Sequence, residues 1–357
     1  MNGLMRNVVL VGDATAKLRS LPSKSIDCII TSPPYYMLRD YGVKNQIGLE
    51  PNVELWVDEM QLACRGLARV LKDSGSLWLN LGDSFSRHPK YGAPAKGLLA
   101  APERLLLRLM DHGWICRGKV IWAKPNPMPS SVADRLNMTY EVVYHLVRSP
   151  RYYFNLDLIR EPHRSSGKKS AGSKIAQPPS WAGPLAGKQD GLRRARPDGL
   201  PGHILGKNPG DVWWMPTRGF RGPHFATFPE SLVVRPLLAT CPEAICVRCG
   251  QPWQRMVTRK RIIVTGNGRR LSPNDRRVNR YKATWSTLHE VGELIPCGCG
   301  APVKPGVALD PFFGSGTVGV VAEKLKRDWV GIELNPEYAD LAIRRLAAER
   351  AKHDISD

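Results

Sequence analysis

One segment near the end of the chain, GVALDPFFGSGTVGVVAEKL at residues 306–325, constrains the fold more than any other. An apolar run ends in Asp310, a turn with Gly314 and Gly316 follows, and helical periodicity begins near Thr317. Strand, glycine turn and helix in this order form the repeating unit of a parallel sheet covered by helices, where ligands bind at the carboxyl ends of the strands. The segment therefore predicts an α/β fold with a ligand-binding turn.

The remainder of the chain shows the same alternation of strand-like and helix-like runs. Strand-like runs occupy residues 7–11, 26–31, 76–81, 116–122, 141–147 and 329–333, and helical periodicity covers residues 53–71 and 102–111. Because strands alternate with helices, we expect one sheet of parallel strands with helices on its faces.

The charge of the chain indicates its partner. There are 52 Lys and Arg residues against 32 Asp and Glu, a formal net charge of +20. Such an excess repels itself unless a polyanion is bound, so we expect nucleic acid as the partner. No apolar run approaches the roughly 20 residues that span a bilayer, and the N-terminus lacks signal-peptide organisation. We therefore expect a cytosolic protein with no membrane partner.

The turn after Asp310 favours one cofactor. Its spacing is neither GxGxxG nor GxxxxGK[ST], which disfavours a dinucleotide or P-loop site. An acid at the strand tip would repel a pyrophosphate, whereas it can pair with a cationic ligand. S-Adenosylmethionine carries both an α-amino group and a sulfonium. The next strand, in WVGIELN, ends in Glu333, which is placed to accept hydrogen bonds from both ribose hydroxyls.

A second turn, in SIDCIITSPPYY, follows a strand and presents hydrogen-bond acceptors. Two prolines, Pro33 and Pro34, hold φ near about −65° and remove two backbone donors. The turn therefore offers the Ser32 hydroxyl, the Pro33 carbonyl and the Tyr35 ring. Two acceptors outside the plane of a base would bind both protons of an exocyclic amine and direct its lone pair at a methyl donor, while the flipped base stacks on the ring. The alternative is a proline-rich turn that only ends the strand.

Together the two turns resemble those of the DNA N4-cytosine and N6-adenine amino-methyltransferases. In that family a [DNS]-P-P-[YF] loop is catalytic and a DPFxGSGT loop binds S-adenosylmethionine. Here SPPY comes first and DPFFGSGT last, which resembles the permuted, beta arrangement of the family. The resemblance implies a circularly permuted, Rossmann-like methyltransferase fold in which both turns meet at one edge of the sheet. The strand before Asp13 and the strand ending in Glu333 would then be neighbours.

The resemblance also assigns roles to residues. Asp13 would face the adenine of the cofactor. The methionine part would be lined by the glycine turn and one aromatic residue before it, namely Asp310, Phe312, Gly314, Ser315, Gly316, Thr317 and Phe228. Serine before the proline pair favours cytosine N4 as the target, because a hydroxyl is a weaker acceptor than a carboxylate. Adenine N6 is the alternative. The segment KPNPMPSSVADR is either a structured loop or part of the pocket for DNA or the target base.

A basic stretch divides the chain. Residues 155–211 hold ten Lys and Arg against five acids and are rich in Gly, Pro and Ser. This composition is typical of a disordered linker or of a DNA-contacting region that orders on binding. The resemblance favours target recognition. The predicted organisation is a catalytic half at residues 1–154, a recognition region at 155–215, a return segment at 216–245, a basic insertion at 246–300 and a cofactor-binding half at 301–357.

The insertion contains a cysteine pattern typical of zinc sites. Cys246, Cys249, Cys297 and Cys299 form a CxxC…CxC set, and in a reducing compartment such clustering favours a structural Zn²⁺ site over disulfides. Unbound reduced cysteines are the alternative. Ten Lys and Arg against three acids lie between the pairs. They form either a zinc-pinned arm that grips DNA phosphates or a solvated charged loop.

The sequence thus predicts direct methyl transfer from S-adenosylmethionine to the exocyclic amine of a flipped base in double-stranded DNA. Two other functions stay open, namely methylation of RNA or of a protein amide, and zinc-dependent DNA binding with an inactive core. The resemblance further implies a bacterial or phage-encoded protein of the nucleoid. It would pair into homodimers and have a cognate restriction endonuclease as partner.

Overall fold

The structure is a computed structural model that describes residues 3–44, 46–161, 203, 205–217, 228–265, 270–271 and 283–354. The chain forms two units. The first comprises residues 1–155, 210–254 and 296–357, and the second comprises residues 156–209 and 255–295. Most of the expected recognition region lies outside the described residues.

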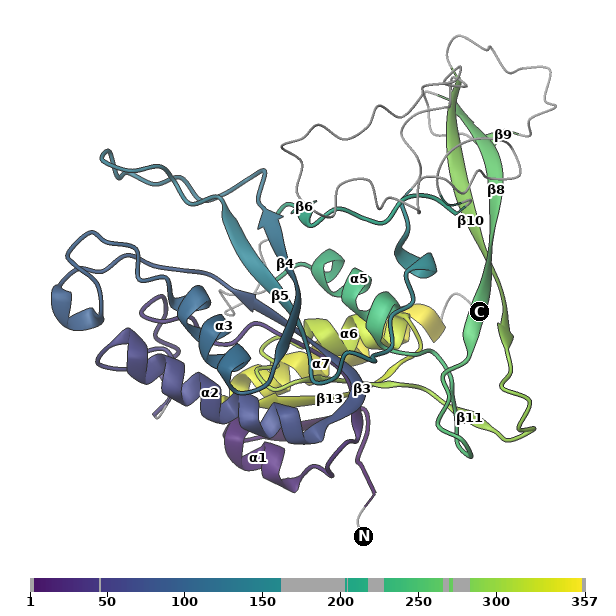
Figure 1. Cartoon of the computed structure of the whole chain (residues 1–357), viewed down its shortest axis with the longest axis horizontal. Coiled ribbons are helices and arrows are strands. Elements are labelled where there is room, and N and C mark those ends of the chain that lie inside the picture. The colour runs from purple at the N-terminus through teal and green to yellow at the C-terminus, as the bar shows by residue number, and fades with distance from the viewer. Residues whose placement is uncertain are drawn as a thin grey trace, which may run out of the picture. The chain divides into compact units, whose positions relative to one another are not determined.

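A mixed eight-stranded sheet forms the centre of the first unit, in the order β1-β13-β12-β2-β3-β5-β4-β6 (Figure 1). Its strands are β1 (Val8–Val11), β2 (Ile26–Thr31), β3 (Leu71–Leu81), β4 (Ile115–Ala123), β5 (Tyr140–Val147), β6 (Val212–Trp214), β12 (Val307–Asp310) and β13 (Asp328–Glu333). Every pair is parallel except the two that β5 makes with β3 and β4. The amino end of β5 therefore lies at the same edge as the carboxyl ends of the other strands.

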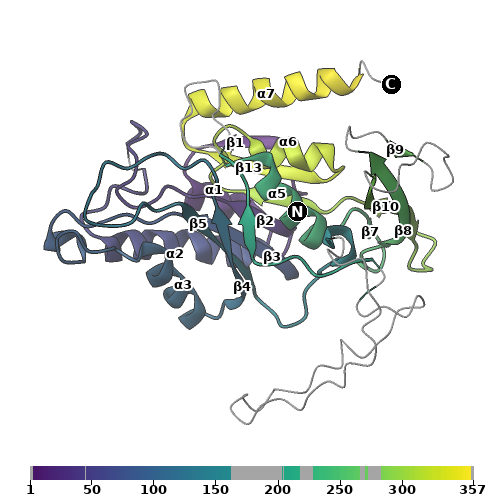
Figure 2. The same ribbon diagram turned by 90° about the horizontal axis from the view of Figure 1, so that it is seen from above.

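Helices cover both faces of this sheet (Figure 2). They are α1 (Ala14–Ser20), α2 (Val53–Val70), α3 (Ala101–Asp111), α5 (Glu230–Thr240), α6 (Thr317–Lys324) and α7 (Pro336–Asp354). The helices α1, α2 and α3 pack on one face in one hydrophobic cluster, and α5, α6 and α7 pack on the other face in a second cluster. Among the described helices none is long and apolar enough to cross a membrane.

The helix α2 shows how the sequence produces this packing. Val53, Trp56, Val57 and Met60 recur at helical spacing and are all buried against the sheet. Asn52 precedes the helix, and its side chain accepts a hydrogen bond from the backbone N–H of Leu55, which caps the first turn.

The predicted α/β fold is confirmed, with a correction to strand direction. The strand β5 is antiparallel to its neighbours because no helix separates it from β4, so the chain turns back directly. The strand β3 also begins earlier than expected. Leu71 pairs with Ile26 and Ser76 with Cys28, so the four residues between Leu71 and Ser76 form an irregularity in the strand.

The neighbouring position of β1 and β13, which the permuted arrangement implies, is observed. The two strands pair in parallel, with Val8 opposite Val330 and Val11 opposite Glu333. The first and the last strand of this sheet in sequence are therefore adjacent in space.

Short strands outside the main sheet were not expected from the sequence. In the first unit, β7 (Ile245–Cys246) pairs antiparallel with β11 (Val303–Lys304). A separate three-stranded sheet in the order β10-β8-β9 consists of β8 (Gln254–Thr265), β9 (Arg270–Leu271) and β10 (Ala283–Ile295), and lies almost wholly in the second unit. Single 3-10 turns occur at η1 (Pro89–Tyr91) and η2 (Asp157–Ile159).

Candidate active site

The sheet brings the two predicted turns together. The strands β2 and β12 are adjacent and parallel, with Ala308 opposite Cys28 and Leu309 opposite Ile29. Their carboxyl ends therefore lie side by side, and the buried Thr31 hydroxyl donates a hydrogen bond of 2.7 Å to Asp310 Oδ1 across 279 positions of sequence. The expectation that the SPPY and DPFFGSGT turns meet at one edge of one sheet is correct.

A polar network surrounds the SPPY turn. Ser32 Oγ lies 2.8 Å from the Tyr35 hydroxyl, which donates a hydrogen bond of 2.7 Å to Glu141 Oε2. Asn80 Nδ2 donates to the same carboxylate oxygen at 2.6 Å and also contacts the Tyr35 hydroxyl. Lys124 forms an ion pair with the other oxygen of Glu141. Each of these side chains stands at an end of β2, β3, β4 or β5 on the same edge of the sheet.

The chemistry of this network fixes the direction of its hydrogen bonds. An ionised carboxylate only accepts, so the single Tyr35 proton points to Glu141. The proton between Ser32 and Tyr35 must then belong to Ser32, whose oxygen accepts from Asn80 Nδ2 at 3.4 Å and keeps one lone pair for another donor. Burial, and then the charge of Glu141, raise the pKa of Tyr35 well above its usual value, so the phenol stays protonated.

Two hydrogen bonds to backbone carbonyls and one close packing contact hold the SPPY turn in position. The Trp56 indole N–H donates to the Pro34 carbonyl at 3.1 Å, and the Ser84 hydroxyl donates to the Tyr36 carbonyl at 3.0 Å. A Cβ atom on Gly82 would come within 2.7 Å of the Tyr35 ring, so only glycine allows the ring its position. Pro33 itself is buried. The turn is a supported element whose residues cannot easily shift.

A pocket that is partly open to solvent lies beside both turns. Two acidic residues line it, Asp13 and Glu333, at the tips of the neighbouring strands β1 and β13. Aromatic side chains supply much of the remaining wall, and they are Phe228, Phe312, Phe313, Tyr41 and Tyr338. Ser32 and Pro34 of the SPPY turn also line the pocket.

Both acids are fixed by backbone donors. Asp13 Oδ1 accepts from the Ala16 N–H at 2.8 Å and caps α1. Glu333 Oε2 accepts from the Gly314 N–H at 2.6 Å, and its Oε1 accepts from the Asn335 N–H at 2.9 Å. Burial raises the pKa of Glu333. Each carboxylate oxygen has two lone pairs, so ligand hydroxyls can still bind.

These residues fit S-adenosylmethionine. Carboxylates at Asp13 and Glu333 suit hydroxyl and amine donors, and the aromatic wall suits a nucleobase, whereas a phosphate would meet negative charge. Gly314 has a φ of +50°, which brings its backbone N–H to Glu333 at the pocket wall. Phe312, Ser315, Thr317 and Phe228 line the same wall.

Two of the predicted cofactor residues lie behind the pocket wall. Asp310 is 1% exposed and is not among the lining residues; its carboxylate accepts from Thr31 and from the Phe312 N–H, and burial raises its pKa to about 7. Gly316, with a φ of +78°, faces α7, where a Cβ would lie 3.0 Å from the Ala342 Cβ. Both residues therefore support the conformation of the glycine turn and do not line the pocket.

Several site residues were not expected from the sequence. Arg345 of α7 donates to the Ser315 carbonyl and hydroxyl at 3.2 Å and to the Thr317 hydroxyl at 3.0 Å, which fixes the glycine turn. Asn80 and Glu141 belong to the SPPY network. A signal for Asn80 was available, since it is a buried amide within the apolar run that ends β3, LWLNL. Glu141 could not be recognised from the sequence, because only the antiparallel direction of β5 places the amino end of this strand beside the SPPY turn.

The proline-rich segment KPNPMPSSVADR has two parts. Its first residue, Lys124, belongs to the SPPY network through Glu141. The rest forms an extended loop between β4 and β5 (Figure 1). This loop is closed by a hydrogen bond of 3.1 Å from Asn137 to the Met128 carbonyl, and Met128 is 88% exposed. A role of this segment in the pocket for DNA or the target base stays a prediction.

The four predicted metal ligands also come together. The sulfur atoms of Cys246, Cys249, Cys297 and Cys299 all lie within 4.8 Å of one another. The remaining described cysteines, including Cys28 and Cys241, are not part of this cluster.

A doubly wound sheet with an acidic, aromatic pocket beside an acceptor-rich SPPY turn defines an S-adenosylmethionine-dependent amino-methyltransferase. The family model described as DNA methylase matches residues 26–247 and 303–344. The chain belongs to this family of DNA N6- and N4-methyltransferases, and the protein is an S-adenosylmethionine-dependent DNA amino-methyltransferase.

Known relatives extend over nearly the whole chain. The Type II methyltransferase M.Cfr9I of Citrobacter freundii is 32% identical over 360 residues, which cover 95% of this chain and 87% of the relative. M.SmaI of Serratia marcescens is 31% identical over 364 residues, covering 96% and 91%.

Solved structures share the fold at low identity. The PvuII DNA methyltransferase (cytosine-N4-specific) aligns with a TM-score of 0.55 at 17% identity, over 96% of this chain and 87% of that one. A putative DNA modification methylase from Thermus thermophilus, complexed with S-adenosyl-L-methionine, aligns with a TM-score of 0.50 at 20% identity, over 96% and 93%.

Proposed function

We propose that this DNA amino-methyltransferase methylates N4 of cytosine in double-stranded DNA. The observation that carries the proposal is the Ser32 hydroxyl, whose proton is directed to Tyr35. Its oxygen accepts one long hydrogen bond of 3.4 Å from the Asn80 amide, and its second lone pair is left for an amine N–H. A neutral hydroxyl is a modest acceptor. The cytosine amine is conjugated with a ring carbonyl, which makes its N–H groups better donors than those of adenine, so a hydroxyl suffices. The PvuII enzyme, whose fold is shared, is also cytosine-N4-specific by name.

The residues of the SPPY turn orient the target amine. Ser32 Oγ and the Pro33 carbonyl accept its two protons, which draws the nitrogen lone pair out of the ring and toward the pocket. The Tyr35 ring stacks on the flipped base, and its position is fixed by Glu141 and Asn80 through the hydroxyl. When bound, S-adenosylmethionine supplies the methyl group on a sulfonium. The residues of the turn position the target amine and stabilise its polarised form, and no covalent enzyme intermediate is needed.

The same network offers a path for the proton that the alkylated amine must lose. Ser32 Oγ takes that proton as its own proton passes to the Tyr35 oxygen, and the Tyr35 proton passes to Glu141. The carboxylate ends up protonated, and Lys124, its ion-pair partner, fixes it in position. Asn80 Oδ1 is buried without a hydrogen-bond partner among the described residues, which leaves a further acceptor beside the site for a substrate donor or a water.

The cofactor residues have complementary roles in the proposal. Glu333 accepts from the ribose hydroxyls and Asp13 faces the adenine, while Phe228 and Phe312 form apolar walls. Asp310 does not line the pocket. Its carboxylate accepts a hydrogen bond from Thr31, the residue before Ser32, and so holds the SPPY turn in position.

We also propose how this methyltransferase recognises its target and which partner it has. Residues 155–215 would recognise the target sequence, and the chain would work in the cytosol as the protective partner of a restriction endonuclease, as the Type II names of its relatives suggest. Pairing of two protomers is part of this prediction and is measured by light scattering of the eluting protein.

Product analysis tests the target base. Duplex DNA is incubated with the protein and S-adenosylmethionine and is then digested to nucleosides, which are identified by mass spectrometry. We expect N4-methyl-deoxycytidine as the methylated nucleoside, and methylation-sensitive sequencing of the same DNA would map the recognition site. N6-methyl-deoxyadenosine in its place would overturn the choice of base and leave the amino-methyltransferase chemistry intact.

A further inference from the structure

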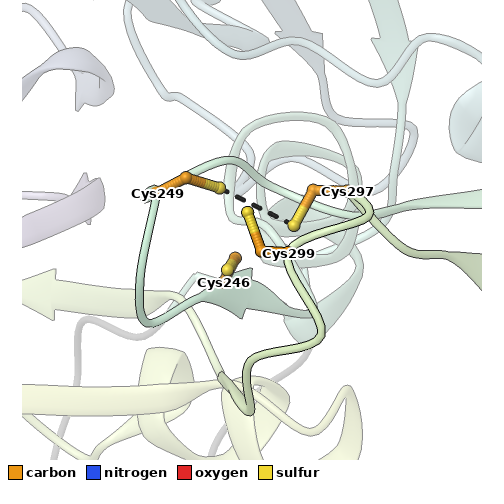
Figure 3. Close-up of side chains that lie close together, drawn as sticks. All are labelled: Cys246, Cys249, Cys297 and Cys299. Carbon is orange, nitrogen blue, oxygen red and sulfur yellow. Dashed lines mark hydrogen bonds between the residues drawn. The ribbon is translucent and has the colours of Figure 1, made fainter.

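Four cysteine sulfurs converge in a cluster that the methyl-transfer reaction does not use (Figure 3). Cys249 Sγ and Cys297 Sγ are 3.6 Å apart, and all four sulfurs lie within 4.8 Å of one another. Four thiolates around one zinc ion, each at about 2.3 Å, would be about 3.8 Å apart at the corners of a tetrahedron. Disulfide sulfurs are only about 2.05 Å apart. The observed spacing matches a metal coordination shell.

We propose that Cys246, Cys249, Cys297 and Cys299 bind one zinc ion as four thiolates. A closed set of four sulfur ligands is typical of structural zinc, because no coordination position is left for water or substrate. The Cys246 side chain is buried, and the other three complete the shell from two turns that approach each other (Figure 3). Binding would release the thiol protons to solvent.

The backbone of the two turns is already arranged for chelation. Gly250, Gly298 and Gly300 have φ values of +72°, +77° and +62°, in the left-handed region where other residues are strained. The Gly250 N–H donates to the Cys246 carbonyl at 2.9 Å, which closes the first turn. Arg248 Nη1 donates to the Cys299 carbonyl at 3.0 Å and links the first turn to the second.

An indole group beside the sulfurs supports the same interpretation. The Trp253 indole N–H is buried and has no hydrogen-bond partner in the described part of the chain, so this donor is left for a metal-bound thiolate. Donors that point at metal-bound ligands hold them in position, and a thiolate accepts such a bond better than a thiol.

The cluster is anchored to the sheet far from the pocket. Cys246 belongs to β7, which pairs with Val303 of β11, and the Gly306 N–H donates to the Pro242 carbonyl at 3.0 Å. Gly306 directly precedes β12, so the site lies at the amino edge of the sheet, whereas the pocket lies at the carboxyl edge. This position indicates a structural role.

The site has a further consequence for the basic insertion. The strand β8 begins at Gln254, five positions after Cys249, and β10 ends at Ile295, two positions before Cys297. One zinc ion would therefore tie together both ends of a segment that holds ten Lys and Arg residues against three acids. The metal would restrict the freedom of that segment and favour its binding to DNA phosphates.

Metal analysis of the purified full-length protein tests the site. We expect one zinc per chain, at least tenfold less in Cys249→Ser, and one again in the control Cys116→Ser, whose cysteine lies outside the cluster. Cobalt loaded into metal-stripped wild-type protein should show the absorption of a tetrahedral tetrathiolate site, which provides the test if Cys249→Ser does not fold. Absence of zinc, iron in its place, or equal loss in both variants would overturn the proposal.

A second measurement tests the link to DNA. Metal-stripped wild-type protein should bind S-adenosylmethionine within twofold of its normal affinity but bind duplex DNA about tenfold more weakly at low salt. Recovery of DNA binding on addition of zinc supports the link. Unchanged DNA binding by the stripped protein would overturn the link. Because metal content and cofactor affinity are measured without turnover, failure here is distinct from failure of the proposed cytosine specificity.

Discussion

At the residue scale, the Ser32 hydroxyl is oriented by its neighbours. Its proton is directed to Tyr35 because Tyr35 donates to Glu141, and the serine oxygen, which also accepts a long hydrogen bond from Asn80, keeps one lone pair for a ligand in the pocket. The hydroxyl is therefore fixed as an acceptor by Tyr35 of the same turn and by Glu141, which comes from another part of the chain.

Ser32→Ala tests this acceptor. We expect the single-turnover rate of methyl transfer to fall by roughly 10²-fold, comparable to the loss of one preorganised hydrogen bond in other active sites. The affinity for S-adenosylmethionine, measured by calorimetry, should change less than twofold. The exposed Ser23→Ala is the matched control. Full activity of Ser32→Ala would remove the hydroxyl from the mechanism.

Tyr35→Phe tests the proton path while it keeps the aromatic ring. We expect single-turnover methylation to slow by roughly 10- to 100-fold, near the lower end of acid–base contributions, with DNA affinity retained. Because Tyr35 and Glu141 act in one chain, the double variant with Glu141→Gln should be no slower than the slower single variant. Rates that multiply in the double variant would show that the two residues act independently.

At the scale of the elements, β3 and β5 are joined by a buried histidine. The His145 ring stacks on Trp78 with ring centroids 4.2 Å apart, and its Nε2 lies 3.0 Å from Ser76 Oγ. Burial, and then the nearby charge of Arg117, lower the pKa of His145 to about 3. The packing of the two strands thus depends on a neutral imidazole.

This histidine predicts a pH dependence of stability. Below its ordinary pKa of about 6.5 an unfolded histidine takes up a proton, whereas His145 in the fold does not until about 3, so acid favours the unfolded chain. The free energy of unfolding should fall by roughly 2 kcal/mol between pH 6.5 and pH 5 through this residue. Urea denaturation of wild type and His145→Gln at both values measures it. Equal losses in the two proteins would contradict the assignment.

At the scale of the whole molecule, the chain has a net charge of +20, whereas the charged residues that line the cofactor pocket, Asp13 and Glu333, are acidic. The excess of basic residues serves the polyanion that carries the target base. Cofactor binding and DNA binding should therefore respond differently to ionic strength.

Salt titration tests this difference. If about six phosphates are contacted, the DNA dissociation constant, measured by fluorescence anisotropy, should rise roughly 10³-fold between 50 and 200 mM salt. Over the same range the S-adenosylmethionine dissociation constant should change less than threefold, because its carboxylate partner Glu333 is buried. A DNA dissociation constant that is independent of salt would contradict an electrostatic role for the excess charge.

The sequence by itself determined the local structure. The strand at Ile26–Thr31, the helix start at Thr317 and the strand tips at Asp310 and Glu333 were predicted, because alternation and helical spacing of apolar residues reflect burial directly. Glycine and proline restrict the backbone wherever they occur, so the two functional turns could also be recognised.

The resemblance implied that the two turns meet, and the tertiary structure alone decided the contacts through which they do. The antiparallel direction of β5 brings Glu141 to Tyr35, and the pairing of β2 with β12 buries Asp310 against Thr31. The convergence of the four cysteine sulfurs depends likewise on the pairing of β7 with β11. Contacts between positions this far apart follow from strand order and direction, and these are set by packing across the whole sheet, which no local pattern of residues encodes.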